Sequence, residues 1–113
     1  GKPKVTKVTA VTDCGEVVNL SGAENQVKGA IIDGMGHAMF AKLNFQAGVA
    51  SPNNFNTYRM IRGNEVPVIE AHFVNNGIAP TGLGEPALPP TGGSIANAIY
   101  AATKKRHYKQ PFS

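Results

Sequence analysis

The chain has 113 residues, with 13 Gly and 8 Pro, which permits one domain or part of one and excludes two complete domains. Charged residues make up 16% of the sequence, below the ~25% usual in soluble domains, and Gly and Pro are enriched, so a coiled coil or helical bundle is not expected. The apolar fraction of 42% can form a core, but a chain of this size buries only about two-thirds of its unfolded surface, so large apolar faces are expected to need a partner.

The net charge of +4 arises in the C-terminal tail. Four cations follow residue 103 without an acid, whereas residues 1–103 carry equal numbers of basic and acidic side chains. A nucleic-acid-binding surface usually forms a basic stripe across a folded face, with aromatic side chains for base stacking. We therefore prefer a solvated tail and expect no nucleic-acid partner.

The sequence shows no pattern for a disulfide, a protein-held metal or a membrane span. Cys14 is the single cysteine, and His37, His72 and His107 lack the short ligand spacing of a zinc site. No apolar run reaches the ~18 residues of a transmembrane helix. The chain begins without an initiator Met or a signal-peptide pattern. A fragment, a processed product and a split subunit all remain open.

The first two elements are expected to be a strand and a long helix. Residues 5–12 are rich in β-branched side chains, which predicts a strand that ends at the turn Asp13-Cys14-Gly15. Ser21 and Glu24 fit a capping box, in which the two side chains satisfy backbone N–H groups at a helix start. Apolar residues then recur at helical spacing, and we expect a helix from about residue 22 to residue 41.

This helix contains Gly29, Gly34 and Gly36, each of which costs about 1 kcal/mol relative to alanine. A glycine on a helix face permits another backbone or a flat ligand to approach closely. From the pattern alone we prefer tight packing and keep a ligand as the alternative. Gly34-Met35-Gly36 also begins a dinucleotide fingerprint, which fails because Met39 replaces the third glycine and no strand directly precedes it.

A hairpin and a second long strand are expected next. Residues 43–45 and 49–51 flank a short glycine-containing loop, which favours a hairpin. Residues 66–74 alternate, with Ile69 on one face and Glu70 and His72 on the other, as in a half-buried strand. Pro67 restricts that strand to a sheet edge, or else Pro67 lies at the start of the strand.

Residues 79–93 contain four prolines and four glycines, and we expect an ordered loop without regular structure, followed by a short helix from Gly93 or Ser94. Gly82-Leu83-Gly84 offers backbone N–H groups beside the carboxylate of Glu85, so this loop can face an anion or a flat cofactor. No Lys follows the glycines, so the loop is not a Walker A motif. By residue chemistry alone, a surface or structural acid is preferred over a catalyst.

Seven motifs occur in an order that resembles the C-terminal end of a molybdenum hydroxylase large subunit. The similarity is to the xanthine dehydrogenase and aldehyde oxidase superfamily, in particular to the bacterial isoquinoline 1-oxidoreductase β-subunit branch, and extends over residues 1–113. The segments that carry it are Asp13 to Leu20, Gln26 to Ala30 with Gly34-Met35-Gly36, Asn54 to Arg59, Val68 to Phe73, Gly82 to Pro86, Ala96 to Thr103 and Pro111-Phe112.

The resemblance implies that Glu85 is the catalytic glutamate, a general base toward the oxygen that attacks an electron-poor substrate carbon. Lys28 and Asp33 differ from the residues common at these positions in the family. No side chain is implied as a metal ligand, since the family holds molybdenum by the pterin dithiolene and inorganic ligands. The residues implied to bind molybdopterin cytosine dinucleotide are Gly82, Leu83, Gly84, Gln26, Gly34 and Gly36.

The implied partners are the remainder of the large subunit, a two-[2Fe–2S] small subunit and, often in this branch, a cytochrome c acceptor. The implied substrate is an aromatic N-heterocycle or an aldehyde, oxidised with water-derived oxygen. We expect the isolated chain to be inactive and to hold no molybdenum. A small non-catalytic binding or scaffold module remains the alternative. Localisation is left open, although this branch is often periplasmic or membrane-associated.

The expected architecture is α+β: a small mixed sheet, a glycine-containing helix and a short C-terminal helix. Residues 1–113 would form one segment of a larger molybdopterin-binding domain. Strand order does not follow from the sequence.

Overall fold

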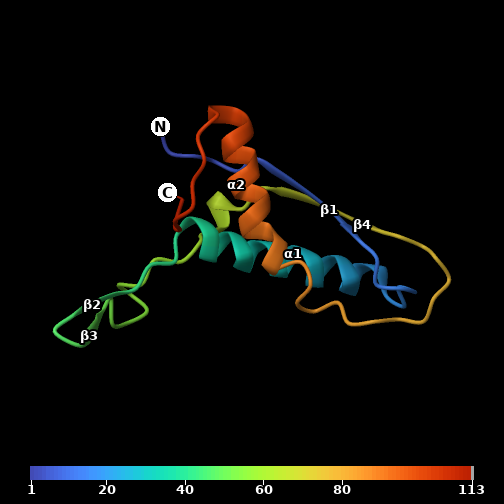
Figure 1. The fold of residues 1–113 in the computed structure, drawn as a ribbon. Helices are drawn as coiled ribbons and strands as arrows, with labels where there is room; N and C mark the ends of the chain where they lie inside the picture. Colours follow the sequence, from blue (N-terminus) through green and yellow to red (C-terminus); the bar gives the residue numbers. More distant parts are fainter. Residues whose placement is uncertain (113) are drawn as a thin grey trace.

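The computed structural model describes residues 1–112 as an α+β fold of two helices and two small sheets (Figure 1). In chain order the elements are β1 (Lys7–Thr12), α1 (Leu20–Met39), β2 (Asn44–Gln46), β3 (Val49–Ser51), the 3-10 turn η1 (Gly63–Glu65), β4 (Val68–Phe73) and α2 (Pro89–Thr103). The expected fold class is confirmed. The parallel and antiparallel pairings, however, form two separate sheets instead of one mixed sheet.

Strands β1 and β4 form a parallel pair although more than fifty residues separate them in the sequence. Both strands alternate between exposed and half-buried residues, and Ile69 faces the interior while Glu70 and His72 are exposed, as predicted. Lys7 and Glu70 form an ion pair at 3.0 Å between the two strands. Pro67 directly precedes β4, where its missing N–H costs no ladder hydrogen bond.

Helix α1 begins at Leu20, and its cap is Asn19 instead of the predicted Ser21. The Oδ1 atom of Asn19 accepts a hydrogen bond from the Gly22 N–H at 2.8 Å, and the hydroxyl of Ser21 donates to the same Oδ1 at 3.1 Å. The prediction was wrong by two residues because Asn19 has the extended backbone that a cap requires, whereas Ser21 already lies in the first turn. Since the cap lies at Asn19, the Ser21–Glu24 capping box does not form.

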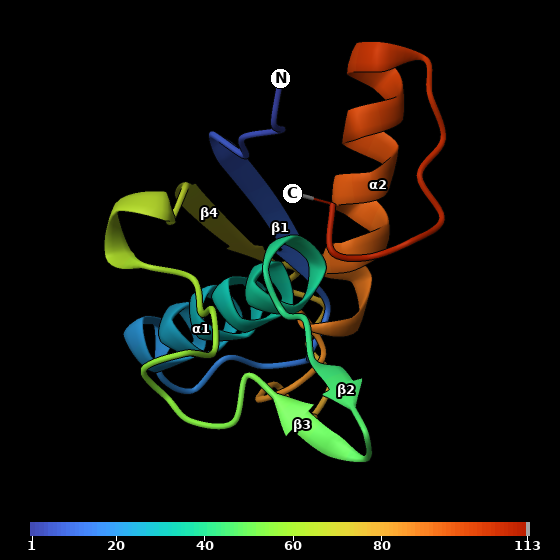
Figure 2. The ribbon, with the colours of Figure 1, turned by 90° about the vertical axis from the view of Figure 1, so that its left-hand side faces the viewer.

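The β1–β4 pair and α2 lie side by side on one face of helix α1 (Figure 2). The buried apolar cluster runs along α1 and receives one residue from α2. Half-buried residues of β1 and β4 pack against it from the sheet side. The members of this cluster are Val27, Ile31, Met35, Ala38, Met39 and Ile95.

Helix α2 begins at Pro89, so the expectation that residues 79–93 contain no regular structure is wrong for the last five. Pro89 and Pro90 occupy the first turn, where the N–H groups have no intrahelical partner and the fixed φ of proline suits a helix. Gly92 and Gly93 then lie inside the helix. The two prolines therefore start α2.

The basic C-terminal tail returns along α2 to the end of α1. Lys104 ends α2 in a left-handed conformation, and the guanidinium of Arg106 lies 3.9 Å from the ring centroid of Tyr100. Further on, the Phe112 N–H donates to the Ala38 carbonyl oxygen at 2.9 Å. The tail is thus held at both ends.

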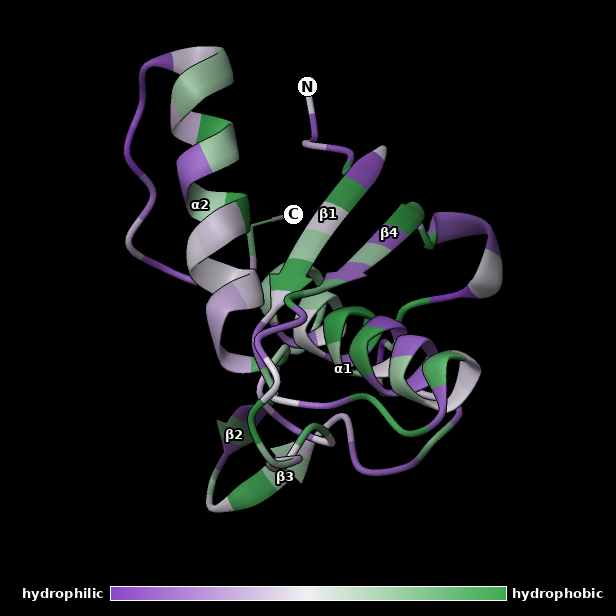
Figure 3. Ribbon diagram, turned by 90° about the vertical axis from the view of Figure 1, so that its right-hand side faces the viewer, coloured by the Kyte–Doolittle hydropathy of each residue, from purple (hydrophilic) through white to green (hydrophobic). Residues whose placement is uncertain are grey.

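The hairpin β2–β3 and the loop after it project from the body (Figure 3). Several of their apolar side chains are exposed. Phe45 is 67% exposed and Phe55 is 92% exposed. The whole chain exposes 7879 Å², against about 6000 Å² expected for a folded monomer of this mass. Its radius of gyration is 16.3 Å, against about 13 Å for a compact domain of this length. In residues 1–112 neither helix combines the length and apolarity needed to cross a membrane.

Candidate functional site

The glycine-rich segment after β4 is fixed at its start by the turn that follows β1. The backbone N–H and the hydroxyl of Thr81 both donate to the carbonyl oxygen of Cys14, at 2.9 and 3.0 Å. Gly15 has φ +73°, and a Cβ there would lie 2.2 Å from the carbonyl oxygen of Ala79. The Asp-Cys-Gly motif therefore serves as a backbone anchor for the loop, and the buried Cys14 is part of it.

The same loop is fixed at its far end by packing and by a turn. Leu83 is half-buried and packs against the core cluster. The Leu88 N–H donates to the carbonyl oxygen of Glu85 at 3.0 Å, which forms the turn leading into α2. The Glu85 residue itself is exposed. The carboxylate is thus carried on a segment held from both sides, as a positioned proton acceptor requires.

The structure brings Gln26 of α1 next to the glycine loop. Its Nε2 atom lies 3.4 Å from the position that a Cβ on Gly84 would occupy. Both residues are exposed, and a Cβ at Gly82 would meet no atom within 4 Å. The site therefore combines an amide, a stretch of backbone without side chains and the carboxylate of Glu85.

Gly34 is buried at the contact between the two helices. A Cβ there would lie 2.9 Å from the Leu88 carbonyl oxygen and 2.9 Å from the Thr91 Cβ. This contact explains Gly34 by packing alone. Tight packing was also the interpretation that the glycine pattern in the sequence favoured. Gly36 lies farther along α1, where a Cβ would make an ordinary contact of 3.7 Å with Ile61. A cofactor contact at either glycine stays a prediction.

Thr91 is a residue of this region that the sequence did not single out. It is the buried polar residue of the described chain, and its hydroxyl donates to the Ala87 carbonyl oxygen at 2.8 Å. The hydrogen bond satisfies the hydroxyl inside α2, while the Cβ packs on Gly34. No sequence signal indicated it, because its burial arises from contact with α1, a segment distant in the sequence.

Two carboxyl groups with shifted pKa values lie in other parts of the chain. The pKa of Glu65 is lowered by the hydrogen bond from the Arg59 side chain and by one from the Arg62 backbone. The pKa of Glu70 is lowered chiefly by Lys7. Both carboxylates belong to structural ion pairs. Residues 1–112 contain no group of three His, Cys, Asp or Glu side chains arranged to hold a metal ion.

Comparison with known proteins identifies the family. A family model described as molybdopterin cofactor-binding domain matches residues 1–67. The membrane-bound aldehyde dehydrogenase [pyrroloquinoline-quinone] of Gluconacetobacter polyoxogenes is 33% identical over 93% of this chain and 14% of its own length. Isoquinoline 1-oxidoreductase subunit beta of Brevundimonas diminuta is 31% identical over 88% of this chain and 13% of its own.

A solved structure shares the fold. Quinoline 2-oxidoreductase from Pseudomonas putida 86 superimposes with a TM-score of 0.85 and 21% identity, over 96% of this chain and 15% of that one. The chain thus spans about one-seventh of the length of the relatives it matches. The expected resemblance is confirmed: the chain belongs to the molybdopterin cofactor-binding domain family and corresponds to part of a molybdenum hydroxylase large subunit.

Proposed function

We propose that this chain supplies the catalytic glutamate loop of a molybdenum-dependent hydroxylase and forms the C-terminal segment of its molybdopterin-binding domain. The observation that carries the proposal is the position of the Gln26 amide against Gly84, one residue before Glu85. Two segments that the family resemblance assigned to one site, far apart in the sequence, lie together. The proposed substrates are aromatic N-heterocycles or aldehydes.

The residues at this position fit a large, flat, polar cofactor. Gly82 and Gly84 leave the backbone accessible, and the amide of Gln26 can donate or accept a hydrogen bond. We propose that these residues contact molybdopterin, in its cytosine dinucleotide form, together with Leu83. The bound cofactor would supply a molybdenum centre as the acceptor for the two electrons released on oxidation of the substrate carbon.

In this proposal Glu85 transfers a proton during the reaction. In the net reaction a carbon–hydrogen bond of the substrate is replaced by a carbon–oxygen bond from water, with release of two electrons and two protons. The Glu85 carboxylate accepts a proton from the attacking oxygen, which makes that oxygen a better nucleophile. The turn from Glu85 to Leu88 fixes the backbone that carries this carboxylate, which supports the proposal.

This chain would perform that reaction only within a larger assembly. It spans 14% or less of the curated relatives named above, so the other walls of the pocket have to come from the remainder of the large subunit. We propose that a small subunit with two [2Fe–2S] clusters and a cytochrome c acceptor, both implied by the family resemblance, carry the electrons away. The isolated chain is expected to be inactive.

The test is Glu85→Gln in the assembled enzyme, with turnover and molybdenum content measured on the same samples. The amide keeps the shape of the side chain but cannot accept the proton, so kcat is expected to fall by about 10²–10⁴-fold with molybdenum retained. Glu16→Gln, at an exposed glutamate in the turn that anchors the loop, serves as the control and should keep full turnover. Full turnover in Glu85→Gln would refute the catalytic role and favour a scaffold function.

A further inference from the structure

Within residues 1–112, strand β1 pairs with β4 and has one edge without a partner strand. The Val68 N–H donates to the Thr6 carbonyl oxygen at 3.2 Å, and the Val74 N–H donates to the Thr12 carbonyl oxygen at 2.9 Å. With the parallel register between β1 and β4, alternate residues of β1 bond to β4 and the intervening ones point away. The peptide groups of Lys7, Thr9 and Val11 therefore lie along the open edge.

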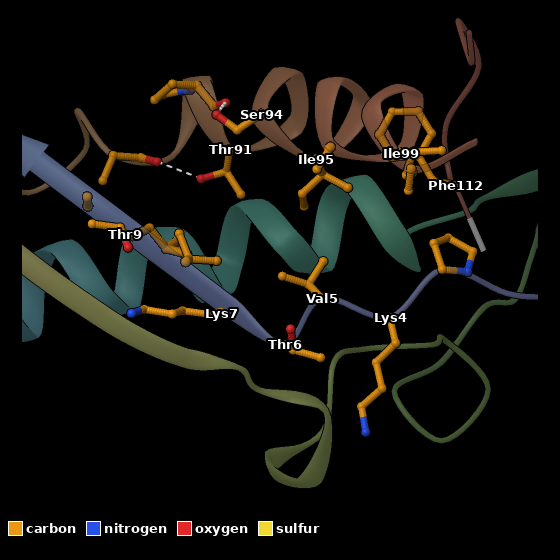
Figure 4. Close-up of a pocket in the computed structure, with 18 of the residues that line it drawn as sticks. Lys4, Val5, Thr6, Lys7, Thr9, Thr91, Ser94, Ile95, Ile99 and Phe112 are labelled. Atoms are coloured by element: carbon orange, nitrogen blue, oxygen red, sulfur yellow. Dashed lines mark hydrogen bonds between the residues drawn. The ribbon is translucent and has the colours of Figure 1, made fainter. Parts of the chain in front are cut away.

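A groove of about 1090 Å³ runs along this edge, between β1 and α2. Figure 4 shows Lys7 and Thr9 on the strand side and Ile95 and Ile99 on the helix side. Ile31 of α1 contributes to the lining. The groove thus combines a row of backbone donors and acceptors with an apolar helix face.

We propose that this groove is the docking site for a β-strand from the remainder of the large subunit, which pairs with β1 and packs against α2. A strand next to β1 would lie about 4.8 Å away and satisfy the open-edge peptide groups. The side chains that it turns toward α2 should be apolar, because exposed Ala98 and Ala102 line the groove there. Lys2 and Lys4 line the same groove and favour an acidic residue in the docking strand.

Three observations favour this occupant. The match with the solved relative covers only 15% of that protein's chain, so most of that chain lies outside the matched region. The β1–β4 sheet has two strands that pack on α1, and a third strand would extend the sheet along its open edge. The chain also exposes nearly 2000 Å² more than a compact monomer of its mass would. The inference rests on the proposed function only in placing the chain within a larger subunit, and it does not depend on Glu85.

Amide hydrogen exchange tests the pairing directly, in the unmodified chain alone and in the assembled enzyme. The amides of Lys7, Thr9 and Val11 should exchange rapidly in the chain alone and at least about 100-fold more slowly in the assembly. The amides of Val8 and Ala10, which face β4 in both states, provide the internal reference. Rapid exchange of the three open-edge amides in the assembled enzyme would overturn the proposal.

A matched pair of variants on α2 tests the helix side of the groove. Ala98 lines the groove and Ala101 does not, although both are exposed alanines of the same helix. Ala98→Lys should reduce recovery of the assembled subunit by about tenfold or more, whereas Ala101→Lys should leave it unchanged. Equal recovery of the two variants would contradict the proposal.

The occupant and the reaction can be separated. If the open-edge amides become protected in the chain alone as its concentration rises, together with a dimer mass, the occupant is a second copy and the proposal is wrong. Glu85→Gln should lower turnover without changing amide protection. Failure of the docking proposal and failure of the catalytic proposal are therefore distinguishable.

Discussion

Replacing Gly34 by alanine tests whether this glycine serves helix packing. The added Cβ would lie 2.9 Å from the Leu88 carbonyl oxygen, a backbone atom that cannot move without shifting the start of α2. Overpacking of this kind costs typically about 1–3 kcal/mol, while the gain in helix propensity returns about 1 kcal/mol. We expect Gly34→Ala to lower the free energy of unfolding by up to about 2 kcal/mol.

Gly29 on the same helix is the matched control, since a Cβ there would meet no atom within 4 Å. Gly29→Ala should gain the full helix-propensity term of about 1 kcal/mol. For a chain of this size, each kcal/mol shifts the melting temperature by roughly 4–8 °C, so the two variants should move in opposite directions. Thermal unfolding followed by far-ultraviolet circular dichroism measures both. A stabilised Gly34→Ala variant would refute the packing explanation.

Two further predictions concern the N-terminal cap of α1 and the ion pair of Glu65. Asn19→Ala removes the observed cap of α1 and should cost about 1 kcal/mol. Ser21→Ala should cost less than about 0.5 kcal/mol, because the better helix propensity of alanine offsets the lost hydroxyl contact. Equal losses in urea unfolding would contradict the cap assignment. Glu65 has a lowered pKa in the folded chain, so the unfolded state binds the proton first as the pH falls. The stability that Glu65 contributes is complete above its unfolded value of about 4.5 and is lost as the pH falls through the lower folded value. Melting temperatures from about pH 7 to about pH 3 should therefore decline less steeply in Glu65→Gln, and identical pH profiles would count against the ion pair.

The candidate site depends on one anchoring contact between segments that are distant in sequence. The turn after β1 holds Thr81 through the Cys14 carbonyl oxygen, and Gly15 permits the close approach. The parallel pairing of β1 with β4 brings these segments together, because both strands end at the same edge of the sheet. The position of Glu85 therefore depends on the sheet as well as on its own loop.

The sequence by itself determined the elements whose signals are local. The β-branched run predicted β1, the period of two predicted β4 with Glu70 and His72 outside, and the glycine-containing loop predicted the β2–β3 hairpin. The order of the motifs also identified the family, since it depends on residue types and not on contacts. The signal for each of these strands and for the hairpin is encoded within a few neighbouring residues.

Tertiary structure decided what depends on contacts between distant residues. Asn19 and Ser21 are both good caps by composition, and only the backbone conformation selects Asn19. The glycines of α1 look alike in the sequence, but Gly34 packs under α2, Gly29 faces open space and Gln26 meets Gly84 across the fold. The parallel pairing of β1 with β4, the open edge it leaves and the groove beside α2 arise from such contacts as well, because strand pairing depends on how the side chains of both strands pack on each other and on α1.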